Sequence, residues 1–412
     1  MKKLILALTL FAFLAGGLAA APKELSVLWF YDDPSELEFL KKACEDYKAK
    51  VPGLEFKINT VPYADLNSKI AQLVAGGTPP DVVKMTDYRA EVAPFIQDLS
   101  KSLGKDFLAP FIPGIAAIMN REGKIIGAPL DVTANGIILN KSLFDKAGVR
   151  IPDQKTAWTY AEFLKAITKV RDSAGVKFPL VWDVTPHRWL TFLFQNGAQV
   201  FTPDGKGNAF NSPATLATFR AWGDFFKNGI IPQSTWGGTE NPRDLFFSGQ
   251  AVAWMSGSWQ VKAMSGIKDF AWTAGPNPYV TTRSSVLGYK YVTGFSTSKY
   301  PAEAAQFIKY FTSKEVNSAY AKALMTISSR TDTGTIDYGS AQASSALNAL
   351  AYELAISPVA ASTNPSNPAM SLSYDRLKES IINVTIGKSS PEEAVAAVSK
   401  VIDEALAATS KK

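Results

Sequence analysis

The sequence predicts an α/β protein in which a sheet of parallel strands carries helices on both faces. From Glu24 onward, short apolar runs alternate with amphipathic stretches, and the apolar runs are continuous rather than interrupted by polar residues. Continuous hydrophobicity is typical of parallel strands that are covered on both faces. The chain is 412 residues long, and single cores rarely grow beyond about 250–300 residues. We therefore expect two α/β lobes.

The amino-terminal elements alternate in type. The runs ELSVLWF, LEFKIN and PDVVKM are expected strands, and helices are expected from Pro34 and over ADLNSKIAQLVAGG. Asp33 followed by Pro34 is a typical helix start. Near the other end of the chain, Ser390 and Glu393 have the spacing of a capping box. The carboxyl end is therefore predicted to be helical.

The first 21 residues have the pattern of a secretory signal. Lys2 and Lys3 precede the apolar run LILALTLFAFLAGGLAA, which ends in small residues. This run is short for a membrane span, and no later apolar stretch reaches the roughly 18 residues that a span needs. No Cys lies at the end of the run, so a lipid anchor is not expected. We expect a soluble, secreted protein of the periplasm with this signal removed.

Charge and composition argue against several classes of function. Lys and Arg number 43 against 37 Asp and Glu, a surplus of 6 that falls to 4 without Lys2 and Lys3. No basic run is present, so nucleic acid is not expected as a partner. The only His and Cys, His187 and Cys44, cannot form the usual zinc sets, and no glycine-rich phosphate loop occurs. No metal and no cofactor are expected, and Cys44 is expected in a core.

Tryptophans are the most distinctive feature of the middle of the chain. In QAVAWMSGSW, the apolar part predicts a buried strand, which places Trp254 in the core. Trp259 follows the carboxyl end of that strand, the edge at which ligands collect in open α/β sheets. Its indole is expected either to stack on a sugar ring or to fasten the next helix to the sheet. The surrounding cluster comprises Trp182, Trp189, Trp236, Trp254 and Trp259, beside His187 and Arg188.

Six segments in a fixed order carry a family resemblance. They are LVAGGTPPDVV, GKIIGAPLDVTANGIILNKSLFDKAGV, TAWTYAEFLKAITKV, NAFNSPATLATFRAWGDFFKNGIIP, LFFSGQAVAWMSGSW and VLGYKYVTGFSTSKYPAEAAQFIKYF. Taken together they span most of the chain. They resemble the extracellular solute-binding proteins of ABC sugar importers, the family that includes maltose-binding protein.

The resemblance implies the two-lobe periplasmic-binding-protein fold of type II, in which strands cross between the lobes and the ligand lies in the cleft. The implied role is to capture a carbohydrate or polyol and deliver it, as a monomer, to the membrane subunits of an ABC permease. The implied crossings lie near residues 129–133, 276–285 and 326–330. The implied divisions are a signal peptide at 1–21, an N-terminal lobe at 22–131 and 284–328, and a C-terminal lobe at 132–283 and 329–412.

The candidate ligand contacts come from the aromatic cluster and from this resemblance. They are Tyr31, Asp33, Asp87, Arg89, Asp131, Thr133, Thr185, His187, Arg188, Trp236, Trp259, Lys290, Tyr291 and Tyr374. Met85 replaces an aromatic residue of the family, and Thr185 stands where maltose-binding protein has a carboxylate, so a maltodextrin is not expected. The bases Arg89, Arg188 and Lys290 also suit a sugar acid or a phosphorylated polyol.

Two other functions remain open on the residues. A secreted glycan-active enzyme would use a carboxylate pair, and Asp32, Asp33, Asp131 and Asp183 all lie near predicted strand ends. Asp at such a position is more often a helix cap, so we do not expect an enzyme. A two-lobe binder of a metal ion or an amino acid is the third possibility, and the scarcity of His counts against iron. Turnover of a sugar would identify the enzyme, because a transport receptor returns its ligand unaltered.

Overall fold

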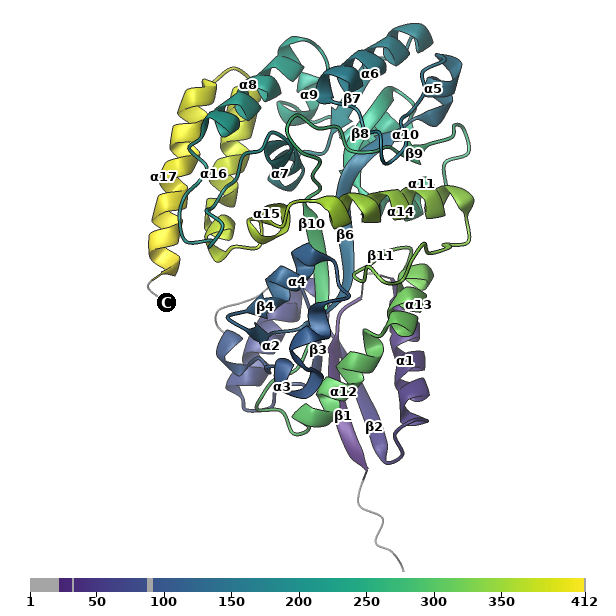
Figure 1. Ribbon diagram of the computed structural model, residues 1–412, viewed down its shortest axis with the longest axis vertical. Helices are drawn as coiled ribbons and strands as arrows, with labels where there is room; N and C mark the ends of the chain where they lie inside the picture. Colours follow the sequence, from purple (N-terminus) through teal and green to yellow (C-terminus); the bar gives the residue numbers. More distant parts are fainter. Residues whose placement is uncertain (1–21, 32, 87–91, 411–412) are drawn as a thin grey trace, which may run out of the picture.

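Two lobes lie one above the other along the long axis of the molecule (Figure 1). This computed structural model describes residues 22–31, 33–86 and 92–410, so the expected signal segment lies outside the described residues. The two-lobe α/β architecture predicted from the sequence is confirmed. The lower lobe of Figure 1, with strands β1 to β3, is called the N-terminal lobe here, and the upper lobe, with β7 to β9, the C-terminal lobe.

One mixed sheet runs through both lobes. The strands are β1 Lys23–Trp29, β2 Leu54–Thr60, β3 Val82–Met85, β4 Asn120–Arg121, β5 Lys124–Ile125, β6 Ala128–Leu139, β7 Phe178–Trp182, β8 Ala251–Gly257, β9 Thr273–Ala274, β10 Leu287–Thr293 and β11 Ile327–Ser328. This sheet has the order β2-β1-β3-β10-β6-β8-β7, with β9 and β11 also paired to β6. Strands β4 and β5 form a separate two-stranded sheet. As predicted, β2 and β3 pair parallel with β1. The strands that cross between the lobes pair antiparallel.

Strand β6 belongs to both lobes. Its residues 128–134 pair with β10, and residues 135–139 pair with β8. Successive side chains of a strand point to opposite faces of the sheet, so Asp131, Thr133 and Asn135 share one face. This row of polar side chains therefore runs along β6 from one lobe into the other.

Helices cover the sheet in both lobes (Figure 1). They are α1 Pro34–Lys48, α2 Leu66–Ala75, α3 Ser100–Leu103, α4 Pro113–Met119, α5 Lys141–Lys146, α6 Tyr160–Ala174, α7 Pro186–Gln195, α8 Pro213–Lys227, α9 Gln233–Trp236, α10 Pro242–Phe247, α11 Val261–Met264, α12 Pro301–Phe311, α13 Lys314–Leu324, α14 Ala341–Ile356, α15 Ala360–Thr363, α16 Pro368–Thr385 and α17 Pro391–Thr409. The predicted capping box of Ser390 and Glu393 opens α17, which confirms the helical carboxyl end.

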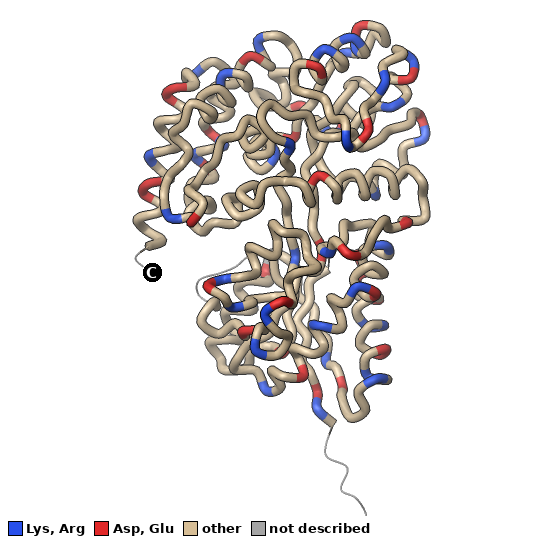
Figure 2. Tube along the Cα trace, in the orientation of Figure 1, with Lys and Arg blue, Asp and Glu red and all other residues tan. Residues whose placement is uncertain are grey.

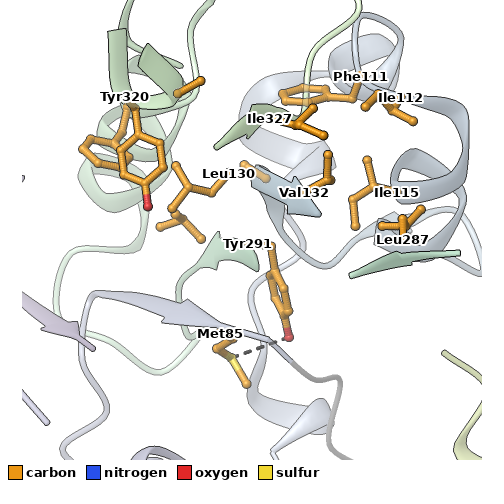
Figure 3. Close-up of a cluster of buried hydrophobic side chains, with 14 of the residues drawn as sticks. Met85, Phe111, Ile112, Ile115, Leu130, Val132, Leu287, Tyr291, Tyr320 and Ile327 are labelled. Atoms are coloured by element: carbon orange, nitrogen blue, oxygen red, sulfur yellow. Dashed lines mark hydrogen bonds between the residues drawn. The ribbon is translucent and has the colours of Figure 1, made fainter. Parts of the chain in front are cut away.

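Two clusters of buried apolar side chains hold the lobes. One fills the N-terminal lobe and continues along β6 and α14 into the C-terminal lobe. Figure 3 shows its central part, in which Leu130 and Val132 of β6 lie near Ile327. The other fills the space between the C-terminal sheet and helices α6, α7, α8, α16 and α17. Cys44 and Trp254 belong to the first cluster, as predicted.

The expected lobe divisions fall in or beside crossing segments. Residues 131 and 132 lie inside β6, residues 283 and 284 precede β10, and residue 328 ends β11. Asn277 lies between these crossings and donates from Nδ2 to the carbonyl oxygens of Asn135 and Ser284. Within the described ranges, no helix combines the length and the apolar character that crossing a bilayer requires.

Candidate functional site

A pocket of about 190 Å³ opens where β6 and β10 leave the N-terminal lobe. Phe30 and Thr86 reach it from the carboxyl ends of β1 and β3, where ligands collect in α/β sheets. The rings of Phe30 and Tyr63 lie 5.1 Å apart. The full lining consists of Phe30, Tyr63, Thr86, Asp131, Thr133, Tyr289 and Lys290. The pocket therefore combines aromatic rings with hydroxyl, carboxylate and ammonium groups.

An ion pair forms the polar side of this pocket. Asp131 Oδ1 lies 3.4 Å from Lys290 Nζ, and the Asp131 side chain is almost fully buried. Lys290 keeps about a quarter of its side chain exposed, with 24% accessibility. Thr133 lies two residues beyond Asp131 on the same face of β6. These groups offer adjacent donors and acceptors to a ligand.

Glu36, Lys84 and Tyr320 lie behind the Asp131 carboxylate. The Tyr320 hydroxyl lies 3.2 Å from Asp131 Oδ2 and 2.9 Å from Glu36 Oε1, and its single proton serves one of them at a time. Lys84 is fully buried, pairs with Glu36 and donates to the Phe30 carbonyl at 2.9 Å. Burial lowers the pKa of Lys84, and the negative charge of Glu36 opposes this effect. A buried charge is stable only when it is paired, so Lys84 and Glu36 stay in contact. Through Lys84 and Tyr320, this pair fixes the positions of Phe30 and Asp131.

Trp259 lies in the C-terminal lobe, on the short 3-10 helix η4 (Ser258–Gln260) that follows β8. It is partly exposed and is not sealed in a core. Its six-membered ring rests on Gly257, since a Cβ at Gly257 would lie 2.1 Å from Trp259 Cζ3. The guanidinium carbon of Arg188 lies over the indole, 4.0 Å from the ring centroid. The indole predicted to stack on a sugar therefore carries Arg188 on one face.

Helix η4 lies next to the pocket along β6. The backbone N–H of Ala134, the residue after Thr133, donates to Ser258 Oγ at 3.1 Å. Asn135 is the register partner of Gly257. The pocket and Trp259 therefore lie beside adjacent residues of β6 and belong to one candidate site.

The first turn of α7 forms another part of the site. Thr185 caps this helix, and the backbone N–H of His187 donates to the Tyr374 hydroxyl at 3.2 Å. Asn135 Nδ2 lies 3.1 Å from His187 Nδ1 and donates to the His187 carbonyl at 2.8 Å. Burial, followed by the charge of Arg188, lowers the pKa of His187 to about 3, so the ring is neutral at neutral pH. His187 thus connects α7 to the crossing strand β6.

An ion pair links the two lobes at the edge of the site. Asp33 caps α1 by accepting from Ser35 N at 2.9 Å, and it also pairs with Lys262 of α11. The Lys262 ammonium, and next the Ser35 backbone, hold the pKa of Asp33 well below its usual range. Nearby Tyr31 is 38% exposed and free to face solvent or a ligand at the end of β1.

Two predicted ligand contacts are wrong for this structure. Trp236 is buried in the C-terminal core, where its Nε1 donates to the Trp182 carbonyl at 3.1 Å. Tyr291 is also fully buried, and its hydroxyl lies 3.6 Å from Met85 Sδ (Figure 3). Tyr291 points to the face of β10 opposite Lys290, the residue before it, and its ring lies 6.2 Å from that of Tyr289. Two further candidates, Asp87 and Arg89, lie outside the described residues.

Four residues that line the pocket were not predicted from the sequence: Phe30, Tyr63, Thr86 and Tyr289. A signal existed for Phe30 and Thr86, because both follow predicted strands at their carboxyl ends. Tyr63 lies on a short 3-10 helix after β2 (Tyr63–Asp65), and nothing in the local pattern marks it as part of a pocket.

The described residues offer limited catalytic and metal chemistry. Asp131 is the only carboxylate among the described residues that line the pocket, so they place no carboxylate pair there. Asp183 accepts from Trp254 Nε1 and Ser256 Oγ, each at 2.7 Å, and so fastens the end of β7 to β8. No group of three His, Cys, Asp or Glu side chains suited to a metal ion occurs in the described part of the chain. Lys and Arg alternate with Asp and Glu over both lobes (Figure 2).

This fold, with a pocket at the strands that cross between its lobes, is that of a two-lobe binding protein. The chain belongs to the bacterial extracellular solute-binding protein family, whose sequence model matches residues 33–318. It is 25% identical over 304 residues to a lactose-binding protein of Rhizobium radiobacter, covering 70% of this chain and 71% of that protein. It is 24% identical over 238 residues to an arabinooligosaccharide-binding protein of Bacillus subtilis, covering 55% and 52% of the two chains.

Solved structures share the fold. A cyclic alpha-maltosyl-1,6-maltose binding protein from Arthrobacter globiformis superposes with a TM-score of 0.78 at 20% identity, covering 93% of this chain and 99% of that chain. A cyclo/maltodextrin-binding protein in complex with maltotetraose gives a TM-score of 0.79 at 21% identity, covering 93% and 97%. At 20% and 21% identity, these structures show that the fold is shared and nothing more specific.

Proposed function

We propose that this protein is the substrate-binding component of an ABC importer, which captures a carbohydrate or polyol between its lobes and delivers it to the membrane permease. Membership of the solute-binding family supports this proposal, and so do the names of its relatives, which bind lactose and arabinooligosaccharide. Export through a signal at residues 1–21, a monomeric state and the lobe divisions at residues 131, 283 and 328 belong to the same proposal.

The pocket beside β6 is the observation that carries the proposal. Lys290 donates and Asp131 accepts, a combination that suits neighbouring hydroxyl groups of one sugar ring. Phe30 and Tyr63 supply apolar ring surfaces for the C–H faces of that ring. Concave sites with aromatic walls and a few fixed polar groups are typical of small-molecule binding.

The charges favour a neutral ligand over a sugar acid or a phosphorylated polyol. Among the described residues of the site, each cation lies beside a carboxylate: Lys290 beside Asp131, Arg188 beside Asp183 and Lys262 beside Asp33. An anionic ligand would have to compete with these carboxylates for its cations, whereas neutral hydroxyls can bond to both members of a pair.

A thermal-shift panel tests the function. Specific binding raises the melting temperature, because a ligand at about 100 times its dissociation constant stabilises the fold by about 2.7 kcal/mol. We expect a neutral sugar to produce the largest shift, above gluconate and inositol phosphates, and chromatography to return that sugar unchanged. Conversion of the sugar to a product would favour the glycan-active enzyme, and a panel without any shift would contradict a carbohydrate receptor.

A further inference from the structure

We propose that Arg188 is a specificity-determining residue that limits the ligand to a small sugar by occupying the face of Trp259. This inference rests on the proposed function, since it concerns the size of the sugar that the site accepts. Three observations carry it: the position of Arg188, the way in which Arg188 is held, and the size of the remaining pocket.

Arg188 takes the place that a second sugar ring would need. Its guanidinium lies 4.0 Å from the centroid of the Trp259 ring, which is contact distance for a stacked pair. The same indole rests on Gly257, so it cannot move away toward β8. A sugar ring that stacks on the covered face of Trp259 must first displace the guanidinium.

Few polar contacts hold Arg188 in this place. Its Nε lies 3.7 Å from Asp183 Oδ2, beyond hydrogen-bond distance, and its Nη1 lies 3.3 Å from Thr185 Oγ1. Asp183 keeps its hydrogen bonds from Trp254 and Ser256 without Arg188. Removal of the arginine side chain therefore uncovers the indole and leaves the carboxylate hydrogen-bonded.

The space left beside β6 is small. A pocket of about 190 Å³ is below the roughly 300–1,000 Å³ of sites for drug-sized ligands. With the Trp259 face covered, this pocket accommodates one sugar ring, and further rings of an oligosaccharide gain no stacking partner there. The expected ligand is thus a monosaccharide.

The variant Arg188→Ala tests whether the indole is covered, without any ligand. Hydroxyl-radical labelling followed by mass spectrometry should show oxidation at Trp259 that is several-fold higher than in the wild type. Arg243→Ala is the matched control, because Arg243 lies 4.7 Å from the ring centroid of Phe247 on α10, outside the site. Equal labelling of Trp259 in wild type and Arg188→Ala would overturn the inference.

Titration with sugar series tests the size limit. The series are glucose, maltose and maltotriose; galactose and lactose; and arabinose and arabinotriose. We expect the wild type to bind the short members best and Arg188→Ala to bind the trisaccharide of the preferred series at least tenfold more tightly than the wild type. The double variant Arg188→Ala with Trp259→Ala should lose this gain, and Arg243→Ala should match the wild type.

The outcomes separate the inference from the proposed function. A wild type that binds a trisaccharide as tightly as the shorter sugars, or an Arg188→Ala variant without any gain, overturns the size limit alone. Failure of the wild type and every variant to bind any sugar overturns the proposed function, and the size limit with it.

Discussion

At the scale of single residues, burial decides which aromatic side chains can reach a ligand. Tyr289 lines the pocket, while Tyr291, two residues later, is fully buried and packs on Gly127, where a Cβ would lie 2.3 Å from Tyr291 Cδ2. Alternation along β10 places both rings on one face, where their centroids lie 6.2 Å apart. Alternation therefore does not tell which of the two rings is buried. That depends on the packing of Gly127 and Met85 against Tyr291, which no local residue pattern indicates.

His187 should make stability depend on pH. A folded-state pKa of about 3 is below the unfolded value of about 6.5, so the unfolded chain takes up the proton first as the pH falls. The stabilising contribution of the neutral ring is complete above pH 6.5 and is lost between pH 6.5 and 3. We expect the wild type to lose about 1 kcal/mol more than His187→Gln between pH 7 and 5.5. Urea unfolding at the two pH values measures this, and equal losses would contradict a neutral imidazole in the folded protein.

Gly257 should tolerate no side chain. Its φ of 174° is ordinary extended backbone, so the obstacle is space: a Cβ would lie 2.1 Å from Trp259 and 2.3 Å from the Ala134 carbonyl oxygen. We expect Gly257→Ala to lower the free energy of unfolding by about 1–3 kcal/mol, as other overpacked substitutions do. Unchanged stability in denaturant unfolding would contradict the close contacts of Gly257 with both Trp259 and Ala134.

At the scale of elements, β6 and α7 determine the geometry of the site. Asp131, Thr133 and Asn135 lie on one face of β6, and Asn135 binds the first turn of α7 through His187. Helices α8 and α17 belong to the C-terminal core and do not line the pocket beside β6, whereas α16 brings Tyr374 to the first turn of α7. Substitutions in α8 should change stability and leave ligand binding intact.

Gly223 in α8 provides such a substitution. The nearest atom to a Cβ at this position is Val384 Cγ1 at 3.4 Å, an ordinary contact. Because Ala has a higher helix propensity than Gly, we expect Gly223→Ala to raise the free energy of unfolding by about 0.5–1 kcal/mol. A loss of stability by the same urea assay would show that α8 cannot shift by even a few tenths of an ångström against α16.

The sequence predicted the helices and strands better than it predicted the residues of the candidate site. Helix starts at Asp33 and Ser390 were predictable because capping depends on residues within one turn. The position of Trp259 after β8 was predictable for the same local reason. Whether Arg188 would cover its ring, or Trp236 would be buried, depends on packing between elements far apart in the chain, which local patterns do not encode.

At the scale of the whole molecule, the lobes are joined by crossing strands and by contacts at the edge of the site. Asp33 and Lys262 form one such contact, with 40% and 56% of their side chains exposed. Exposed ion pairs contribute about 0–1 kcal/mol and weaken with salt. This pair should therefore favour the arrangement of the lobes seen here by a small amount.

Lys262→Met should shift the lobes toward a more open arrangement. With dyes on the two lobes of the ligand-free protein, we expect the population of the lobe arrangement seen here to fall up to about fivefold. The wild type in about 1 M salt, where the screening length is about 3 Å, should show the same fall in population as Lys262→Met. Lys23→Met is the control, because Lys23 pairs with Glu303 inside one lobe. Identical energy transfer in Lys262→Met and Lys23→Met would contradict the role of the pair.

Calorimetric titration of the wild type, Lys290→Met and Lys322→Met with the sugar that gives the largest thermal shift tests the central claim most directly. Lys290 borders the pocket, whereas Lys322 lies near Asp337, 4.0 Å away on the outer side of the N-terminal lobe. We predict one sugar per chain with an affinity of about 1 μM for the wild type and Lys322→Met, and an affinity about 10–100-fold weaker for Lys290→Met. Equal affinities in all three proteins would place the sugar elsewhere and contradict a binding site at the crossing strands.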